Sequence, residues 1–162
     1  MKFYKNVIRN VFTKIYFLYK ILKNIFTDEK CKKVKGEWTM CNILISINPK
    51  YVESIFNGTK KYEYRKVKCK QDIDKIIIYS THPIMKVVGE AKVEEILEDS
   101  PEKIWNITQK ESGINFKFYS DYYENREKAI AYKLTDIIKY DFPKDLELYG
   151  VKFAPQSFVY VQ

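Results

Sequence analysis

The sequence has few of the residues on which metal and nucleotide sites usually depend. It contains one histidine, His82, and three cysteines, Cys31, Cys41 and Cys69, with no CxxC pair among them. A zinc site of the usual His/Cys kind is therefore not expected. Neither GxxxxGK(S/T) nor GxGxxG occurs, which argues against a P-loop or a dinucleotide-binding fold. We expect the protein to work without a cofactor.

Long apolar runs are also missing. Apolar residues recur at spacings of three and four through residues 1–26, which predicts one basic amphipathic helix. Lysines and arginines interrupt it throughout, so we do not expect it to span a bilayer. A secretory signal, with a clean apolar centre and a small-residue cleavage site, is not evident either. Because three cysteines without a pairing pattern favour a reducing compartment, we expect a cytoplasmic protein.

The positive charge is unevenly distributed along the chain. The formal net charge is +8, but residues 1–39 carry ten basic and three acidic side chains, which leaves residues 40–162 nearly neutral. Within that neutral part, residues 60–70 hold six basic side chains and one acidic one. We call residues 60–70 the basic strip. It is better support for an anionic partner than the overall charge is.

The predicted helix at residues 1–26 admits several interpretations. A basic amphipathic helix can lie on a membrane surface or bind a partner protein. It can also pack on the rest of the chain, have no functional role, or be absent if translation begins at Met40. Residues 27–40, which contain several lysines and Gly36, are typical of a polar linker.

From Cys41 onward the pattern predicts one α+β domain over residues 41–162. Strands are expected at 41–47, 61–66, 75–80, 85–96, 129–140 and 158–161, with a bulge or bend at Gly89. Helices are expected at 49–57 and from Ser100-Pro101, and a short helix or aromatic loop at 114–123. This order favours a curved sheet that closes into a small mixed barrel with inserted helices, rather than a doubly wound parallel fold.

A run of polar residues follows the first predicted helix. Residues 45–66 read ISINPKYVESIFNGTKKYEYRK, and Gly58, Lys60, Glu63 and Arg65 fit the pattern Gly-x-Lys-x-x-Glu-x-Arg. With this signature, residues 41–162 resemble the ASCH domain family. Further stretches also resemble it: Tyr79-Ser80, Val88-Gly89-Glu90, Glu98-Asp99-Ser100-Pro101, Glu111-Ser112-Gly113-Ile114 and Ala154-Pro155-Gln156-Ser157-Phe158.

The resemblance implies a PUA-like barrel with a cleft between the barrel and its helices. Such folds are associated with RNA binding or nucleobase recognition, and some ASCH proteins are amidohydrolases of acylated cytidines or ribonucleases. In the hydrolytic relatives a signature Lys, a Thr three positions later and a downstream Glu act together. Here the first position is Lys60 and the third falls near Glu111, but Glu63 stands where the hydroxyl is expected. That departure favours binding over catalysis.

The residues of the signature suggest a polar cleft. Alternation along strand 61–66 places Lys61, Glu63 and Arg65 on one face and Tyr62, Tyr64 and Lys66 on the other. Lys60 and Arg65 would hold a phosphate or carbonyl oxygen, and Glu63 would orient them. The alternative is a half-exposed strand whose charges pair with neighbouring strands.

Three other sets of residues are secondary candidates. Lys61 and Lys66 extend the basic strip and could contact nucleic acid. Gln156 precedes the last strand, where it could read a base edge or stabilise a turn. The aromatic residues at 116–123 could stack on bases, but their helical spacing favours a helix packed on the barrel. The leading hypothesis is a module that binds RNA or a modified nucleoside; hydrolysis of an acylated cytidine or of RNA in the same cleft is the alternative.

Overall fold

The computed structural model describes residues 33–34, 37–38 and 41–161. The chain divides into two compact units, Met1–Thr39 and Met40–Gln162. In the first, β1 (Lys33–Val34) and β2 (Glu37–Trp38) form a short antiparallel pair within the segment expected to be a linker. The helix expected at residues 1–26 lies outside the described residues, so its proposed roles stay predictions.

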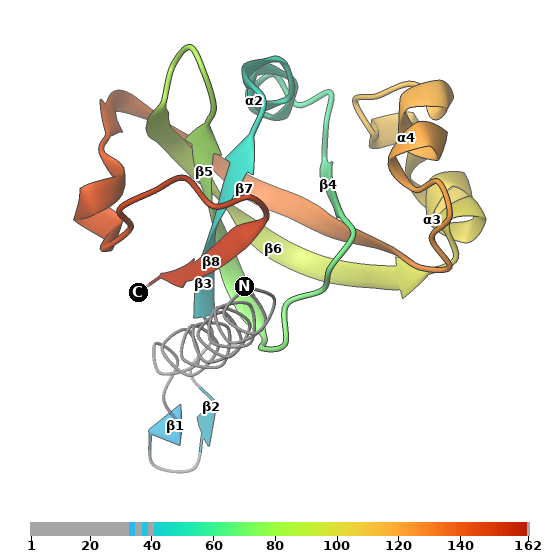
Figure 1. Cartoon of the computed structure of the whole chain (residues 1–162), viewed down its shortest axis with the longest axis horizontal. Coiled ribbons are helices and arrows are strands. Elements are labelled where there is room, and N and C mark those ends of the chain that lie inside the picture. The colour runs from blue at the N-terminus through green and yellow to red at the C-terminus, as the bar shows by residue number, and fades with distance from the viewer. Residues whose placement is uncertain (1–32, 35–36, 39–40, 162) are drawn as a thin grey trace, which may run out of the picture. The chain divides into compact units, whose positions relative to one another are not determined.

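The second unit is a mixed α+β domain built on one six-stranded sheet (Figure 1). Its elements are β3 (Cys41–Ile47), α2 (Pro49–Phe56), β4 (Tyr62–Arg65), β5 (Ile73–Ser80), β6 (Lys86–Asp99), α3 (Pro101–Thr108), η1 (Gln109–Glu111), α4 (Phe116–Tyr122), β7 (Ala129–Lys144), η2 (Leu146–Tyr149) and β8 (Phe158–Val161). The strand order is β4-β7-β6-β5-β3-β8. Only β3 and β5 pair in parallel; the other neighbours in this sheet are antiparallel.

The sheet is not a closed barrel, so that part of the fold prediction was wrong. Within residues 41–161, β4 and β8 occupy the two edges and do not pair with each other. The ladder between β8 and β3 ends at Ile45, which leaves the last residues of β3 beyond it. There the Arg65 guanidinium of β4 donates to the Ser46 carbonyl oxygen at 2.9 Å. The Arg65 side chain thus spans the opening in the sheet, which strand pairing would have filled in a closed barrel.

The turn after α2 sets the position of Lys60. The side-chain oxygen of Asn48 caps the helix by accepting from the Lys50 N–H at 3.0 Å, with proline in the first turn as the sequence predicted. Gly58 follows the helix with φ of +79°, a conformation that glycine adopts without a steric penalty. The chain then folds back, and the Lys60 N–H donates to the Ser54 carbonyl at 2.9 Å. Lys60 is therefore held against α2 by its backbone.

Gly89 marks the predicted bulge in the long strand β6. The register with β7 shifts between Val87 and Gly89, and the register with β5 shifts nearby. A Cβ added to Gly89 would lie 2.3 Å from the Ile138 carbonyl oxygen and 2.8 Å from the Phe56 ring. Only glycine allows β6, β7 and α2 to come this close.

Helices α3 and α4 cover one end of the sheet with an aromatic core. Tyr62 and Tyr64 of β4 are buried against Ile104, Tyr119 and Tyr123 of the helical layer. The Tyr64 hydroxyl donates to Thr108 Oγ1 at 2.7 Å, and the Tyr123 hydroxyl donates to the Arg65 carbonyl at 3.0 Å. These bonds satisfy the polar ends of the buried rings. Trp105 is half-buried and packs against this cluster.

Because several tyrosines are buried, we expect the domain to lose stability above about pH 10. Burial raises the pKa of Tyr64 to about 12, and it raises the pKa values of Tyr119, Tyr123 and Tyr132 as well. A folded-state pKa above the unfolded value of 10.0 means that the unfolded chain releases its phenolic protons first. The stabilisation is therefore complete below pH 10 and is lost as the pH rises toward 12.

Urea unfolding between about pH 8 and pH 11.5 measures this loss, with ultraviolet absorbance of tyrosinate recorded in parallel. Tyr64→Phe is the matched variant, because it removes one of the raised pKa values. Its stability should fall less steeply with pH than that of the unsubstituted protein. Equal slopes, or full tyrosinate absorbance in the folded state near pH 10, would contradict the interpretation.

Across the helices of residues 41–161, none combines the length and the apolar content that a membrane crossing requires. The cytoplasmic location stays a prediction.

Candidate functional site

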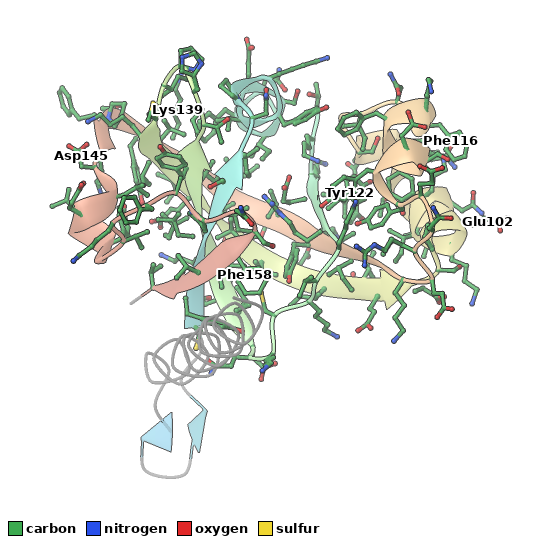
Figure 2. All side chains as sticks on the ribbon, viewed as in Figure 1. Glu102, Phe116, Tyr122, Lys139, Asp145 and Phe158 are labelled. Carbon is green, nitrogen blue, oxygen red and sulfur yellow. The ribbon has the colours of Figure 1, made fainter. Side chains whose placement is uncertain are left out.

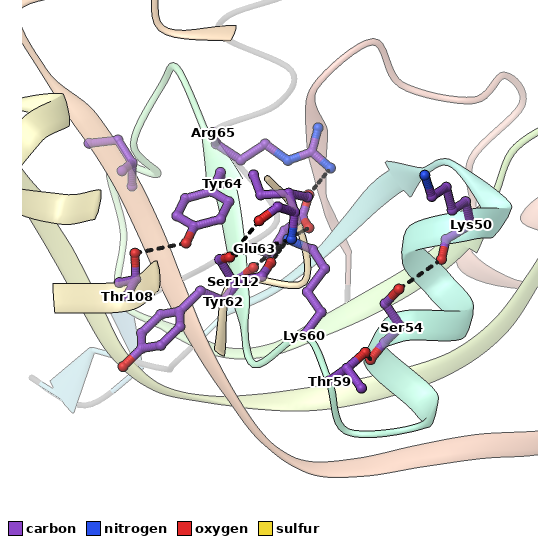
Figure 3. Close-up of polar contacts among 12 residues, drawn as sticks. Lys50, Ser54, Thr59, Lys60, Tyr62, Glu63, Tyr64, Arg65, Thr108 and Ser112 are labelled. Atoms are coloured by element: carbon purple, nitrogen blue, oxygen red, sulfur yellow. Dashed lines mark hydrogen bonds and ion pairs between the residues drawn. The ribbon is translucent and has the colours of Figure 1, made fainter. Parts of the chain in front are cut away.

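A pocket of about 170 Å³ opens where the sheet fails to close, between β3, α2, β4 and α4. Figure 3 shows three residues of its lining, Lys60, Glu63 and Arg65. Lys60, Glu63 and Arg65 form its charged wall. Aromatic rings form much of the remainder: Tyr51, Tyr64, Phe118 and Tyr122. We call it the Arg65 pocket. Three of the four signature residues therefore meet in one cavity, while Gly58 shapes the turn that leads to it.

Lys60 is buried. Only 2% of the residue is exposed, and its Nζ donates to the Tyr62 carbonyl at 2.5 Å. The same amine lies 3.5 Å from Glu63 Oε2 and 4.7 Å from the centre of the Tyr64 ring. Burial lowers the pKa of Lys60, and the neighbouring Glu63 carboxylate opposes that effect. The amine is thus held in an environment that weakens its hold on the proton.

Arg65 has a hydrogen-bond donor to spare. Its Nη2 lies 2.9 Å from Glu63 Oε1 and donates to the Ser46 carbonyl at the same distance. Its Nε is buried and has no hydrogen-bond partner. With Lys60 protonated, two cations face one carboxylate, so the cluster carries a net charge of +1. Such a site suits a ligand group that is anionic or that accepts hydrogen bonds.

Strand β4 is buried on both faces, so the alternative of a half-exposed strand is wrong. Its four residues, Tyr62 to Arg65, are all buried. Tyr62 and Tyr64 belong to the aromatic core, and Tyr64 also reaches the pocket lining, whereas Glu63 and Arg65 turn toward the pocket. The predicted alternation holds within these four residues, but helices α3 and α4 cover the face that a bare strand would have left exposed.

Helix α4 contributes side chains to both the aromatic core and the Arg65 pocket. Tyr119, together with Tyr123 directly after the helix, is buried in the core, while Phe118 and Tyr122 line the Arg65 pocket. Figure 2 shows Tyr122 on the side of α4 that faces β4. The sequence suggested that residues 116–123 pack on the sheet or stack on bases. In the structure one face of this segment packs in the core and the other lines the Arg65 pocket.

The sequence did not single out Ser46 or Tyr51 as pocket residues. Tyr51 lies on α2, and the centre of its ring is 5.5 Å from that of Phe118, which also lines the pocket. Nothing in the local sequence around Ser46 indicates that it lies in a pocket. Its carbonyl receives Arg65 only because the chain brings the end of β3 opposite β4, and its hydroxyl donates to the Pro155 carbonyl at 2.7 Å.

Several predicted site residues lie outside the Arg65 pocket. Lys61 and Glu111 form an ion pair with each other, 2.5 Å apart, and neither lines the cavity. Lys66 is exposed, with its amine 4.6 Å from the centre of the Tyr122 ring. Gln156 is exposed next to Pro155. Because Lys60 and Arg65 are buried, the basic strip does not form one continuous surface.

The segment Glu111–Ile114, distant in sequence, closes the pocket from the other side. Ser112 pairs with Lys60 in an isolated antiparallel bridge, and its carbonyl accepts from the Lys60 amine at 3.4 Å. Gly113 follows with φ of +64°, and a Cβ there would lie 2.4 Å from the Cβ of Lys60. The backbone at Gly113 therefore fixes the stem of Lys60. Among the residues that the structure describes, no cluster of three or more His, Cys, Asp or Glu side chains could hold a metal ion.

The family of this domain follows from comparison with known proteins. A model of the ASCH domain matches residues 45–138, which run from β3 into β7 and include the charged wall of the pocket. The chain belongs to the ASCH domain family. The crystal structure of ASCH from Zymomonas mobilis superimposes with a TM-score of 0.69 at 28% identity, over 75% of this chain and 87% of that one. The ASCH fold, and with it membership of the PUA-like superfamily, is thus shown.

Curated relatives of this ASCH domain include proteins of different kinds. An ASCH domain-containing ribonuclease of Zymomonas mobilis subsp. mobilis is 32% identical over 57% of this chain. A protein named ATP synthase subunit alpha of Ureaplasma parvum serovar 3 is 30% identical over 85% of this chain. The chain spans 64% of the first relative and 17% of the second. The domain therefore occurs within proteins of very different length.

Proposed function

We propose that this ASCH domain binds single-stranded RNA and holds one phosphate or one base edge of it in the Arg65 pocket. The observation that carries the proposal is the buried, unpartnered Arg65 Nε beside a cluster of two cations and one carboxylate. A buried donor without a partner is costly, and a phosphate or carbonyl oxygen would satisfy it. The similarity to a protein named as a ribonuclease supports RNA as the source of that oxygen.

The aromatic walls support a single strand over a duplex. Tyr51, Phe118 and Tyr122 surround the charged wall. Unpaired bases stack on such rings, whereas the bases of a duplex are already stacked on each other. The pocket would thus combine an ionic contact to phosphate or carbonyl oxygen with stacking on a base. A modified nucleoside, the other ligand suggested by the sequence, would use the same two features.

Arg65→Lys tests the proposal, because it keeps a positive charge beside Glu63 and removes the planar fork. We expect its affinity for a labelled single-stranded RNA of about ten nucleotides to fall about 10-fold, which is about 1.4 kcal/mol. Fluorescence anisotropy at fixed salt measures the change, with DNA of the same sequence as a second ligand. Lys92→Gln, which removes an exposed charge outside the pocket, is the control. Unchanged RNA affinity in Arg65→Lys would rule out this pocket as the RNA site.

RNA cleavage in the same pocket is a second candidate, because burial lowers the pKa of Lys60 toward the range of a general base. Incubation of end-labelled RNA with the unsubstituted protein and with Lys60→Met would detect it. Products no more abundant with the unsubstituted protein than with Lys60→Met would exclude it. Glu63 occupies the place of the hydroxyl in hydrolytic relatives, so we expect no hydrolysis of N4-acetylcytidine. Release of cytidine would restore the amidohydrolase alternative.

A further inference from the structure

A second cavity adjoins the Arg65 pocket. It has a volume of about 430 Å³ and lies between α2, the turn before β4, η1 and the start of α4. Tyr51, Ile114 and Phe118 line both cavities, so one wall separates them. We call the second cavity the Lys50 pocket, after a lining residue that the Arg65 pocket lacks.

The linings of the two cavities differ in chemistry. The Arg65 pocket is narrow and mainly aromatic around its buried charges. The Lys50 pocket is lined by the exposed lysines Lys50 and Lys110 and by polar side chains such as Thr59 and Asn115. No carboxylate is among the described residues that line it. Glu111, next in sequence to Lys110, pairs with Lys61 instead. The Lys50 pocket thus presents two positive charges that no lining carboxylate neutralises.

The size of the Arg65 pocket limits what it can enclose. Pockets that enclose a drug-sized ligand usually measure about 300–1,000 Å³. At about 170 Å³, the Arg65 pocket has room for a ring or a phosphate group, but not for a whole nucleotide. The remainder of a bound nucleotide, and the chain attached to it, must lie outside. The adjoining Lys50 pocket is larger, at about 430 Å³, and Lys50 and Lys110 give it a positive charge. It could therefore take the next part of a bound RNA strand.

We propose that the Lys50 pocket is a second subsite that takes the neighbouring nucleotide of the same strand, with Lys50 and Lys110 on its phosphate. This rests on the proposed function, because the first nucleotide must occupy the Arg65 pocket. The Tyr51 and Phe118 rings, 5.5 Å apart, lie where the strand passes from one subsite to the next. The ligand class is therefore a phosphodiester-linked oligonucleotide of two or more residues, rather than a free nucleoside. Figure 3 shows Lys50 on α2 and Thr59 in the turn that follows this helix.

The test compares ribonucleoside monophosphates with the corresponding dinucleotides and trinucleotides by isothermal titration calorimetry. We expect the unsubstituted protein to bind dinucleotides about 10-fold more tightly than monophosphates. The Lys50→Gln/Lys110→Gln variant should lose that advantage and keep its affinity for monophosphates. Its salt dependence with longer RNA should also weaken by about 0.7 in log–log slope for each phosphate contact removed. Lys92→Gln/Lys152→Gln, which removes two exposed charges that line neither pocket, is the matched control.

The outcomes separate this inference from the proposed function. If monophosphates and dinucleotides bind the unsubstituted protein equally, or if the dinucleotide advantage survives in Lys50→Gln/Lys110→Gln, the second subsite is wrong while the first stands. If the matched control loses the advantage equally, general electrostatic attraction explains it and the subsite is wrong. If none of the ribonucleotides binds, the proposed function fails and the subsite fails with it.

Discussion

Glu63→Gln will destabilise the domain by about 3–5 kcal/mol, because it leaves two buried cations without their counter-charge. Glu63 lies 2.9 Å from Arg65 and 3.5 Å from Lys60, and the residue is only 6% exposed. An amide of nearly the same shape cannot balance either charge. Since domains of this size are usually stable by about 5–15 kcal/mol, the loss would be a large part of the total.

Urea unfolding monitored by tryptophan fluorescence measures this loss, and Glu111→Gln is the matched control. Glu111 also pairs with a lysine in the same region, but both side chains of that pair are more than 40% exposed. Removing an exposed pair costs at most about 1 kcal/mol. If Glu63→Gln costs no more than Glu111→Gln, the buried cluster does not contribute to stability as the distances suggest.

The pH dependence of Glu63→Gln provides an independent check. The Glu63 carboxylate raises the pKa of Lys60 against the larger lowering caused by burial. Without it the pKa of Lys60 falls further below the unfolded value of 10.5. A lysine with a lowered pKa is penalised while it is charged, and the penalty is relieved as the pH rises toward the unfolded value. The deficit of Glu63→Gln relative to the unsubstituted protein should therefore shrink as the pH rises from neutrality toward the unfolded value of 10.5.

The elements that sequence reasoning located well are those fixed by local chemistry. Asn48, Pro49 and Gly58 bound α2 as capping rules require, and Ser100-Pro101 begin α3 in the same way. Gly89 marks a bulge because a side chain there would collide with neighbouring backbone. Each of these residues acts within a few positions of the chain, so its role is visible in the sequence.

The features that were missed depend on contacts between distant segments. At the opening of the sheet Arg65 reaches Ser46, and no local pattern in either strand indicates that contact. The burial of Lys60 depends on the segment at Ser112 and Gly113, which closes over its stem. From the sequence, Lys61 and Glu111 were candidate site residues like their neighbours. In the structure they form an ion pair with each other outside the Arg65 pocket. Residue type thus identified the charged cluster, while tertiary contacts decided which charges are buried.

Gly113→Ala will test how the fold holds Lys60, and we expect it to cost about 2–4 kcal/mol. Two effects combine: the backbone has φ of +64°, and the added methyl group would lie 2.4 Å from Lys60 Cβ and 3.1 Å from its Cα. The contact is with the stem and backbone of Lys60, not with the end of a flexible chain, so it cannot be relieved by a rotamer change. Lys60 must move, and the amine then moves away from the Tyr62 carbonyl and Glu63.

Gly58→Ala separates the two effects. Gly58 has a similar φ of +79°, but a Cβ there would meet nothing within 4 Å. It should cost only about 1 kcal/mol, the strain of a left-handed conformation in a non-glycine residue. Urea unfolding of both variants gives the difference in stability, and RNA binding gives a second readout that strain alone would not move. Gly113→Ala should weaken binding because it displaces Lys60, whereas Gly58→Ala, which adds a side chain facing open space, should weaken it much less. Equal losses of stability in the two variants would show that the segment at Gly113 does not position Lys60, and the charged wall of the pocket would then depend on β4 and α2 alone.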